Sequence, residues 1–176
     1  AGKPPLKPGT YYSVTVKTDA GKTSKDDEGK NLDFYLLDAQ KAMVVRAKIA
    51  KLRAIKLTPE AEGLGLAYLY QGYELRAEAI LLLEELVKGG SQNTAVYQLL
   101  GDLYLQVGLS REAKSYYERG LKLAKQTGDI EGQGDAQVGL GEVALSLGKR
   151  TEARELFTQA IANYHKLGDE ITVKEI

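Results

Sequence analysis

The sequence predicts an all-α solenoid of about three helical hairpins, preceded by one helix and a short N-terminal β-hairpin. Two observations predict the solenoid. The stretch "LLGDLYLQVGLSREAKSYYERGL", Leu99 to Leu121, returns 40 residues later as "GLGEVALSLGKRTEARELFTQAI". Within each copy the apolar residues recur with the three- and four-residue spacing of a helix. Because repeats of roughly 20 to 50 residues are stacked units of supersecondary structure, each copy is expected to be a pair of antiparallel helices.

Residues 1–38 are expected to form the β-hairpin. "YYSVTV" alternates hydrophobic and polar residues, which is strand periodicity, and "NLDFYLLD" has the composition of a second strand. The "DAGKTSKDDEGK" between them has the composition of a loop. Its "AGKTS" ends like a phosphate-binding loop, but Val16 stands where that motif requires its first glycine, so no phosphate site is expected.

Residues 39–57 are expected to form a connecting helix capped by Asp38. The helix contains no acidic residue and six basic ones, which are Lys41, Arg46, Lys48, Lys51, Arg53 and Lys56. This pattern is compatible with a surface that binds an anion or nucleic acid, but it is more often a solvated face balanced by nearby acids such as Glu60 and Glu62. No aromatic residues alternate with the basic ones, which favours the solvated face and argues against a nucleic-acid partner.

Helical repeats are expected over residues 58–176, divided as 58–91, 92–128, 129–168 and the start of a further repeat at 169–176. Thr58 followed by Pro59 predicts the start of the first helix. Gly108 and Gly148 fall where the first helix of a pair must end, which suits a left-handed cap. Ser110 is then expected to cap the second helix.

Two glycines, Gly101 and Gly141, stand in the middle of predicted helices. A glycine there costs about 1 kcal/mol relative to alanine, so some other interaction must offset it. Close approach of the paired helix is the expected cause, with Ala113 and Ala153 as the facing small residues.

The spacing of small and aromatic residues resembles the tetratricopeptide repeat. One copy supplies that signature with Tyr97, Leu100, Gly101, Tyr104, Ala113, Tyr117 and Gly120. The next copy supplies Gln137, Leu140, Gly141, Ala144, Ala153, Phe157 and Ala160. The earliest copy departs from the pattern, with Ala67 and Glu74 at the two glycine positions. The resemblance implies a scaffold that binds a protein or peptide in a concave groove. The alternative is a structural spacer or oligomerisation module of a larger envelope protein.

In that family the groove is lined by the first helix of each pair. The resemblance places ten residues there: Leu64, Tyr68, Gln71, Gln98, Asp102, Leu105, Asp135, Val138, Glu142 and Leu145. These include three acids and no Lys or Arg, so the expected partner is a basic or neutral segment. Gln98 and Asp102 stand where a groove that clamps a C-terminal carboxylate would need Lys or Asn, which disfavours that mode.

No enzyme active site, metal site or cofactor is expected. The chain has no cysteine, and His165 is its single histidine, with Asp169 as the one nearby candidate ligand. Asp102, Asp135 and Glu142 lack a paired nucleophile, so they are expected to be a polar groove lining. Lys plus Arg equals Asp plus Glu at 24 each, which gives no overall bias toward nucleic acid. No apolar run approaches the length of a membrane span.

"LKPGTYYSVTV" resembles the approach to the penultimate strand of immunoglobulin-like or fibronectin type III sandwiches. This implies that residues 1–38 are the last strands of such a sandwich, with an unpaired strand edge that favours homo-oligomers. A sandwich end followed at once by helical repeats is similar to cell-envelope proteins of the cyanobacterial type. The resemblance implies an extracytoplasmic location, in the periplasm or cell envelope.

Overall fold

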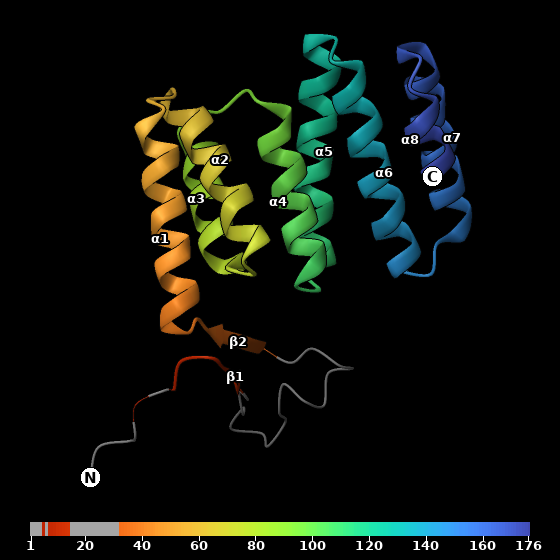
Figure 1. Ribbon diagram of the computed structural model, residues 1–176. Helices are drawn as coiled ribbons and strands as arrows, with labels where there is room; N and C mark the ends of the chain where they lie inside the picture. The colour runs from red at the N-terminus through yellow and green to blue at the C-terminus, as the bar shows by residue number, and fades with distance from the viewer. Residues whose placement is uncertain (1–4, 6, 15–31) are drawn as a thin grey trace.

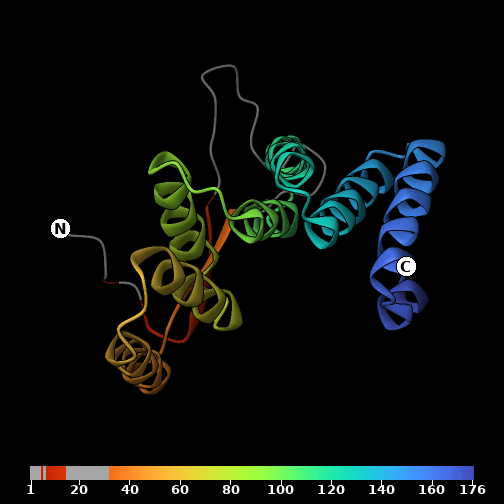
Figure 2. The same ribbon diagram turned by 90° about the horizontal axis from the view of Figure 1, so that it is seen from above.

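The computed structural model describes residues 5, 7–14 and 32–176, and in this part of the chain α1 and the pairs of helices that follow it stand side by side in one row (Figure 1). Seen from above, the row curves, with α2, α4 and α6 on its inner side (Figure 2). The predicted all-α solenoid is therefore confirmed. The helices are α1 (Ala39–Ala54), α2 (Pro59–Gly72), α3 (Arg76–Lys88), α4 (Thr94–Gln106), α5 (Ser110–Thr127), α6 (Ile130–Ser146), α7 (Arg150–Leu167) and α8 (Glu170–Glu175).

Two short strands precede the helices. β1 (Thr10–Val14) and β2 (Leu32–Leu36) pair antiparallel, with Thr10 opposite Leu36 and Val14 opposite Leu32. The segment expected to be the loop between them, including "AGKTS" and Val16, lies outside the described residues. The origin of residues 1–38 in a β-sandwich stays a prediction.

The first two helices begin where the sequence predicts. The Asp38 carboxylate accepts a hydrogen bond of 2.7 Å from the Lys41 N–H, and the Thr58 hydroxyl accepts one of 3.3 Å from the Ala61 N–H. Both contacts satisfy N–H groups that the first helical turn leaves unpaired. The first helix ends earlier than predicted, at Ala54, because Lys56 has a left-handed backbone with φ of 57°.

The predicted left-handed glycines are confirmed, whereas the predicted Ser110 cap is wrong. Gly108 and Gly148 have φ of 78° and 74°, and Glu74, at the same position of the earliest pair, has φ of 61°. Ser110 is the first residue inside α5, and the residue before it, Leu109, accepts a 3.0 Å bond from the Ala113 N–H. Because the turn at Gly108 is tight, the backbone carbonyl of Leu109 is already the first hydrogen-bond acceptor of α5.

An aromatic ring, and not a facing alanine, explains the glycine in the middle of α4. The Tyr117 side chain is fully buried, and a Cβ added to Gly101 would collide with its ring. A Cβ added to Gly139 on α6 would collide with the same ring, so Tyr117 fills the space between two hairpins. Tyr117, and not the predicted Ala113, supplies the three atoms nearest to a Cβ added at Gly101. Gly141 repeats the arrangement with the ring of Phe157, in place of the predicted Ala153.

A polar contact replaces an aromatic residue in the last complete hairpin. Gln137, which stands where the other copy has Tyr97, is buried on α6. Its Oε1 accepts a 2.8 Å bond from Asn163 Nδ2, and its Nε2 donates a 2.9 Å bond to Gln159 Oε1. Because both ends of the amide are paired, the substitution is tolerated inside the core.

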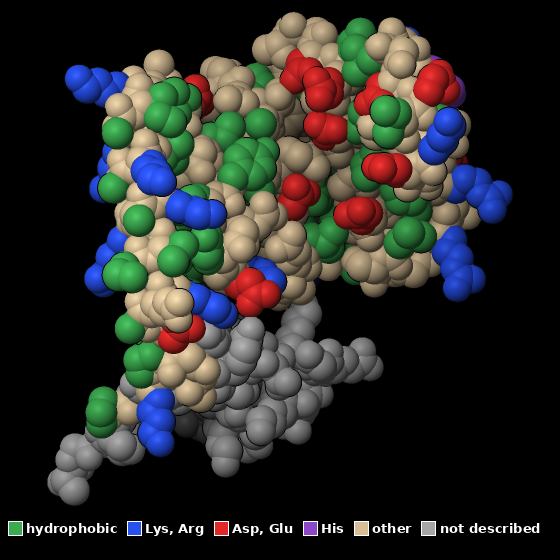
Figure 3. All heavy atoms as spheres, in the orientation of Figure 1, with side chains coloured by type: hydrophobic (Ala, Val, Ile, Leu, Met, Phe, Trp, Pro, Cys, Tyr) green, Lys and Arg blue, Asp and Glu red, His purple; other side chains and the backbone are tan. Residues whose placement is uncertain are grey.

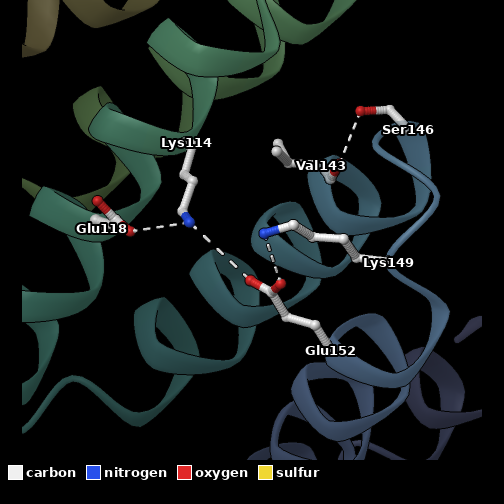
Figure 4. Close-up of polar contacts among 6 residues, drawn as sticks. All are labelled: Lys114, Glu118, Val143, Ser146, Lys149 and Glu152. Atoms are coloured by element: carbon white, nitrogen blue, oxygen red, sulfur yellow. Dashed lines mark hydrogen bonds and ion pairs between the residues drawn. The ribbon is translucent and has the colours of Figure 1, made fainter.

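Ion pairs join the ends of α5 and α7 at the edge of the solenoid (Figure 4). Lys114 Nζ lies 3.7 Å from Glu118 Oε1 and 4.0 Å from Glu152 Oε1, and Lys149 Nζ lies 3.0 Å from Glu152 Oε2. All four side chains are about half exposed, so each pair contributes roughly 0.2 to 1 kcal/mol. The apolar core between the helices therefore provides most of the stability.

Candidate functional site: a concave groove on α2, α4 and α6

Two adjacent depressions lie on the inner helices. One, of about 290 Å³, is formed by α2, α4, α5 and the start of α6, and its lining includes Tyr68, Gln98, Asp129, Glu131 and Asp135. The other, of about 350 Å³, lies between α4 and α6 and is lined by Gln98, Asp102, Leu105, Gln106, Val138, Gly139 and Glu142. Gln98 belongs to both linings, so the two depressions are neighbouring parts of one surface, called here the groove.

The structure brings most of the predicted groove residues together. Those that line a depression are Tyr68, Gln98, Asp102, Leu105, Asp135, Val138 and Glu142. Their spacing of three and four residues puts each set on one face of α4 or α6. The other three predicted residues line neither depression. Leu64 packs against the buried core around Ala67, Gln71 is half-buried, and Leu145 is 51% exposed.

Asp102 stands at the centre of the groove and is held by two hydrogen bonds. Its Oδ1 accepts a 2.8 Å bond from the Tyr117 hydroxyl and a 3.1 Å bond from Gln98 Nε2. Burial raises the pKa of Asp102 to about 6, the negative charges of Glu142 and Asp135 add to the rise, and the two hydrogen bonds oppose it. The groove thus keeps a carboxylate in a costly, partly desolvated position.

Asp135 has the same arrangement in the next hairpin. The Tyr164 hydroxyl donates a 2.6 Å bond to Asp135 Oδ1, and burial raises the pKa of this carboxyl too. Burial also raises the pKa values of Tyr117 and Tyr164, and their carboxylate partners raise them further. Both phenols therefore stay protonated and act as donors at neutral pH.

No pattern in the sequence pointed to these tyrosines as hydrogen-bond donors. Tyr117 follows Asp102 by 15 residues and Tyr164 follows Asp135 by 29. Neither separation is a helical spacing, so no local pattern could have linked the partners.

Two further acids line the groove although they were not among the ten residues predicted from the sequence. Asp129 caps α6 by accepting a 2.9 Å bond from the Gly132 N–H, and it accepts a 2.6 Å bond from the Thr94 hydroxyl of α4. Glu131 lies one turn before Asp135 on α6. With Asp129 and Glu131 the two linings contain five acids, and they contain no Lys or Arg among the described residues.

Charge is unevenly spread over this side of the molecule. In Figure 3, which has the orientation of Figure 1, acidic side chains gather over the half that holds α4 to α8, whereas basic side chains lie along the α1 end and at the opposite edge of the molecule. Because the whole chain has no net charge, the negative potential of the groove is a local property.

Gln98, which lines both depressions, carries one unpaired atom. Its Oε1 is buried and has no hydrogen-bond partner within the described residues. A buried acceptor without a donor costs roughly 1 to 3 kcal/mol.

The basic helix and the histidine have ordinary surface partners. On α1, Arg53 Nε lies 3.2 Å from Glu62 Oε1, and Lys48 Nζ lies 5.2 Å from the centre of the Tyr73 ring. His165 Nδ1 lies 3.0 Å from Glu170 Oε1, while Asp169, its expected neighbour, caps α8 instead.

The described part of the chain contains no group of three or more His, Cys, Asp or Glu residues placed to hold a metal ion. None of its helices has the length and apolar content that crossing a membrane requires.

Comparisons with known proteins agree with the fold. Residues 91–166 match the family model described as "Tetratricopeptide repeat". BtubC (BKLC) from P. vanneervenii superposes with a TM-score of 0.54 at 21% identity, over 76% of this chain and 60% of that one. The TPR-like repeats of a candidate kinesin light chain from Podosopora anserina superpose with a TM-score of 0.52 at 24% identity, over 73% of this chain and 71% of that one.

These similarities have limits of length and of sequence. The chain spans less than two thirds of BtubC, and at these identities the superpositions show the fold alone. No curated protein matches the chain significantly. The family match therefore concerns residues 91–166, and the superpositions show that the chain shares the fold of TPR-like repeats.

Proposed function

We propose that the chain binds a basic or neutral segment of another protein in the groove between α2, α4 and α6. The observation that carries the proposal is the composition of the two depressions. They combine five acids with the apolar side chains of Leu105 and Val138 and the half-exposed ring of Tyr68, and neither lining contains a Lys or Arg among the described residues. Proteins of this repeat family are generally non-enzymatic scaffolds, and the proposal gives the carboxylates no catalytic role.

The apolar and acidic residues contribute in different ways. Ion pairs at an exposed surface are worth only roughly 0.2 to 1 kcal/mol each. Tyr68, Leu105 and Val138 therefore supply most of the affinity by removing apolar surface from water. The acids mainly raise the rate of association with a basic segment.

A peptide array followed by titration at low and high salt tests this function. We expect basic and neutral segments to be captured, and their affinity to fall as salt rises, because salt screens the attraction. Glu142→Gln in the groove should weaken that salt dependence, whereas Glu155→Gln, an exposed acid on α7, should leave it unchanged. Preferential capture of acidic C-termini, or binding that strengthens with salt, would contradict the proposal.

A second candidate function is an oligomerisation module of a larger protein. The observation that favours it is the strand pair β1–β2, because a strand edge without a neighbour recruits other chains. Deleting residues 1–37, which leaves the Asp38 cap in place, should shift the protein toward monomer in light scattering at high salt. An unchanged mass distribution would count against strand-mediated association.

We propose an extracytoplasmic location as well, because a sandwich end followed at once by helical repeats resembles cell-envelope proteins. Fractionation of cells that express the protein tests it. Recovery in the cytoplasmic fraction would contradict it.

A further inference from the structure

The charge of α1 is the opposite of the charge of the groove. The helix carries Lys41, Arg46, Lys48, Lys51 and Arg53, and no Asp or Glu. Only Val45 of this helix is buried, and α1 lies at the end of the row, where it packs on α2. Most of α1 is therefore available to a partner.

One stripe of α1 combines basic and apolar residues. Val44, Lys48, Lys51 and the capping residue Ile55 follow each other at intervals of four, three and four residues, which places them along one side of the helix. All four are exposed, Val44 by 40% and Ile55 by 64%, and the Lys48 ammonium group also lies over the Tyr73 ring at the end of α2. Two ammonium groups between two aliphatic side chains match a groove that alternates carboxylates with Leu105 and Val138.

The stripe and the groove of one molecule are held apart by the fold. α1 is fixed against α2 at one end of the row, whereas the groove acids lie on α4 and α6 (Figures 1 and 2). A contact between stripe and groove therefore requires two molecules.

We propose that the α1 stripe of one molecule docks in the groove of a second copy of this chain. The inference rests on the proposed function, since it names one basic segment that the groove accepts. Such a contact joins two different surfaces, so each bound pair keeps one free stripe and one free groove. Head-to-tail association then continues with concentration, and it weakens with salt because both surfaces are charged.

Two charge-neutralising variants of the full chain test the proposal in sedimentation velocity. The stripe variant carries Lys48→Gln with Lys51→Gln, and the groove variant carries Glu131→Gln with Glu142→Gln, all at exposed positions. We expect the wild type to associate at low salt and each variant to associate about tenfold more weakly on its own. A mixture of the two variants should form a 1:1 complex of wild-type strength, because one retains the groove and the other the stripe.

A matched control removes the same number of charges elsewhere. Lys122→Gln with Lys125→Gln, exposed on α5, should associate like the wild type. Thermal melts followed by circular dichroism check that every variant is folded. A basic peptide captured by the groove should dissociate the wild-type assemblies.

Several results would overturn head-to-tail docking. A wild type that stays monomeric at low salt while still capturing basic peptides overturns this inference alone, and loss of peptide capture as well overturns the proposed function too. If association persists at high salt and in both variants, another surface mediates it and head-to-tail docking is wrong. A third result would assign the stripe to membranes instead. In that case the wild type is monomeric in solution and binds phosphatidylserine vesicles, and the stripe variant does not bind them.

Discussion

Replacing Gly101 with leucine is expected to destabilise the fold by about 3 kcal/mol, because the new side chain has no space. The position faces the ring of Tyr117, which is fully buried and also packs against Gly139 of the next hairpin. The ring cannot swing aside, since its hydroxyl donates the 2.8 Å bond to Asp102. Chemical denaturation, read as the free energy of unfolding, measures the effect.

Gly72→Leu is the matched control for this substitution. Gly72 is the last residue of α2, and a Cβ there meets nothing within 4 Å. Its replacement should change the free energy of unfolding by less than about 0.5 kcal/mol. A Gly101→Leu protein as stable as this control would show that α4 and α5 do not pack as described. Adding Tyr117→Ala to Gly101→Leu should recover part of the loss if the ring is the obstacle.

Replacing Asp102 with asparagine is expected to stabilise the protein at pH 7 by about 2 kcal/mol. Because burial raises the pKa of Asp102 from 3.8 to about 6, the folded state holds the proton more tightly than the unfolded state does. The contribution of Asp102 to stability is therefore fully present below pH 4, and it is lost as the pH rises toward 6 and beyond. Asparagine carries no charge, so it avoids this cost while keeping an oxygen for the Tyr117 hydroxyl.

Denaturation curves at a series of pH values measure the effect. From pH 4 to pH 7 the Asp102→Asn protein should lose less stability than the wild type, and the two should converge at low pH. Glu142→Gln, which removes an exposed acid of the same groove, should alter the free energy of unfolding at pH 7 by less than about 0.5 kcal/mol. A wild type more stable than Asp102→Asn at pH 7 would contradict the burial argument.

The Asp102→Asn variant also distinguishes a binding groove from a structural spacer. If Asp102 serves a basic partner, Asp102→Asn should weaken capture of basic peptides while stabilising the fold. A carboxylate kept at a cost to stability is a mark of a functional position. Unchanged peptide capture would favour a role for the surface other than the proposed one.

The sequence by itself determined the helices and several of their ends. Helical spacing of apolar residues, the caps at Asp38 and Thr58, and the left-handed glycines at Gly108 and Gly148 are local properties of a few neighbouring residues. The same local spacing placed Gln98, Asp102 and Leu105 on one face of α4, and Asp135, Val138 and Glu142 on one face of α6. The repeat then indicated that these faces lie on neighbouring helices.

Only the tertiary structure decided which side chains contact one another between helices. Tyr117 rather than Ala113 faces Gly101, and Tyr117 also reaches Asp102, because the angle and offset between α4 and α5 fix which side chains can touch. For the same reason, Asp129 joins the groove through Thr94, although its place in the sequence shows only a cap. Contacts between helices depend on how the helices pack, and no spacing along a single helix contains that information.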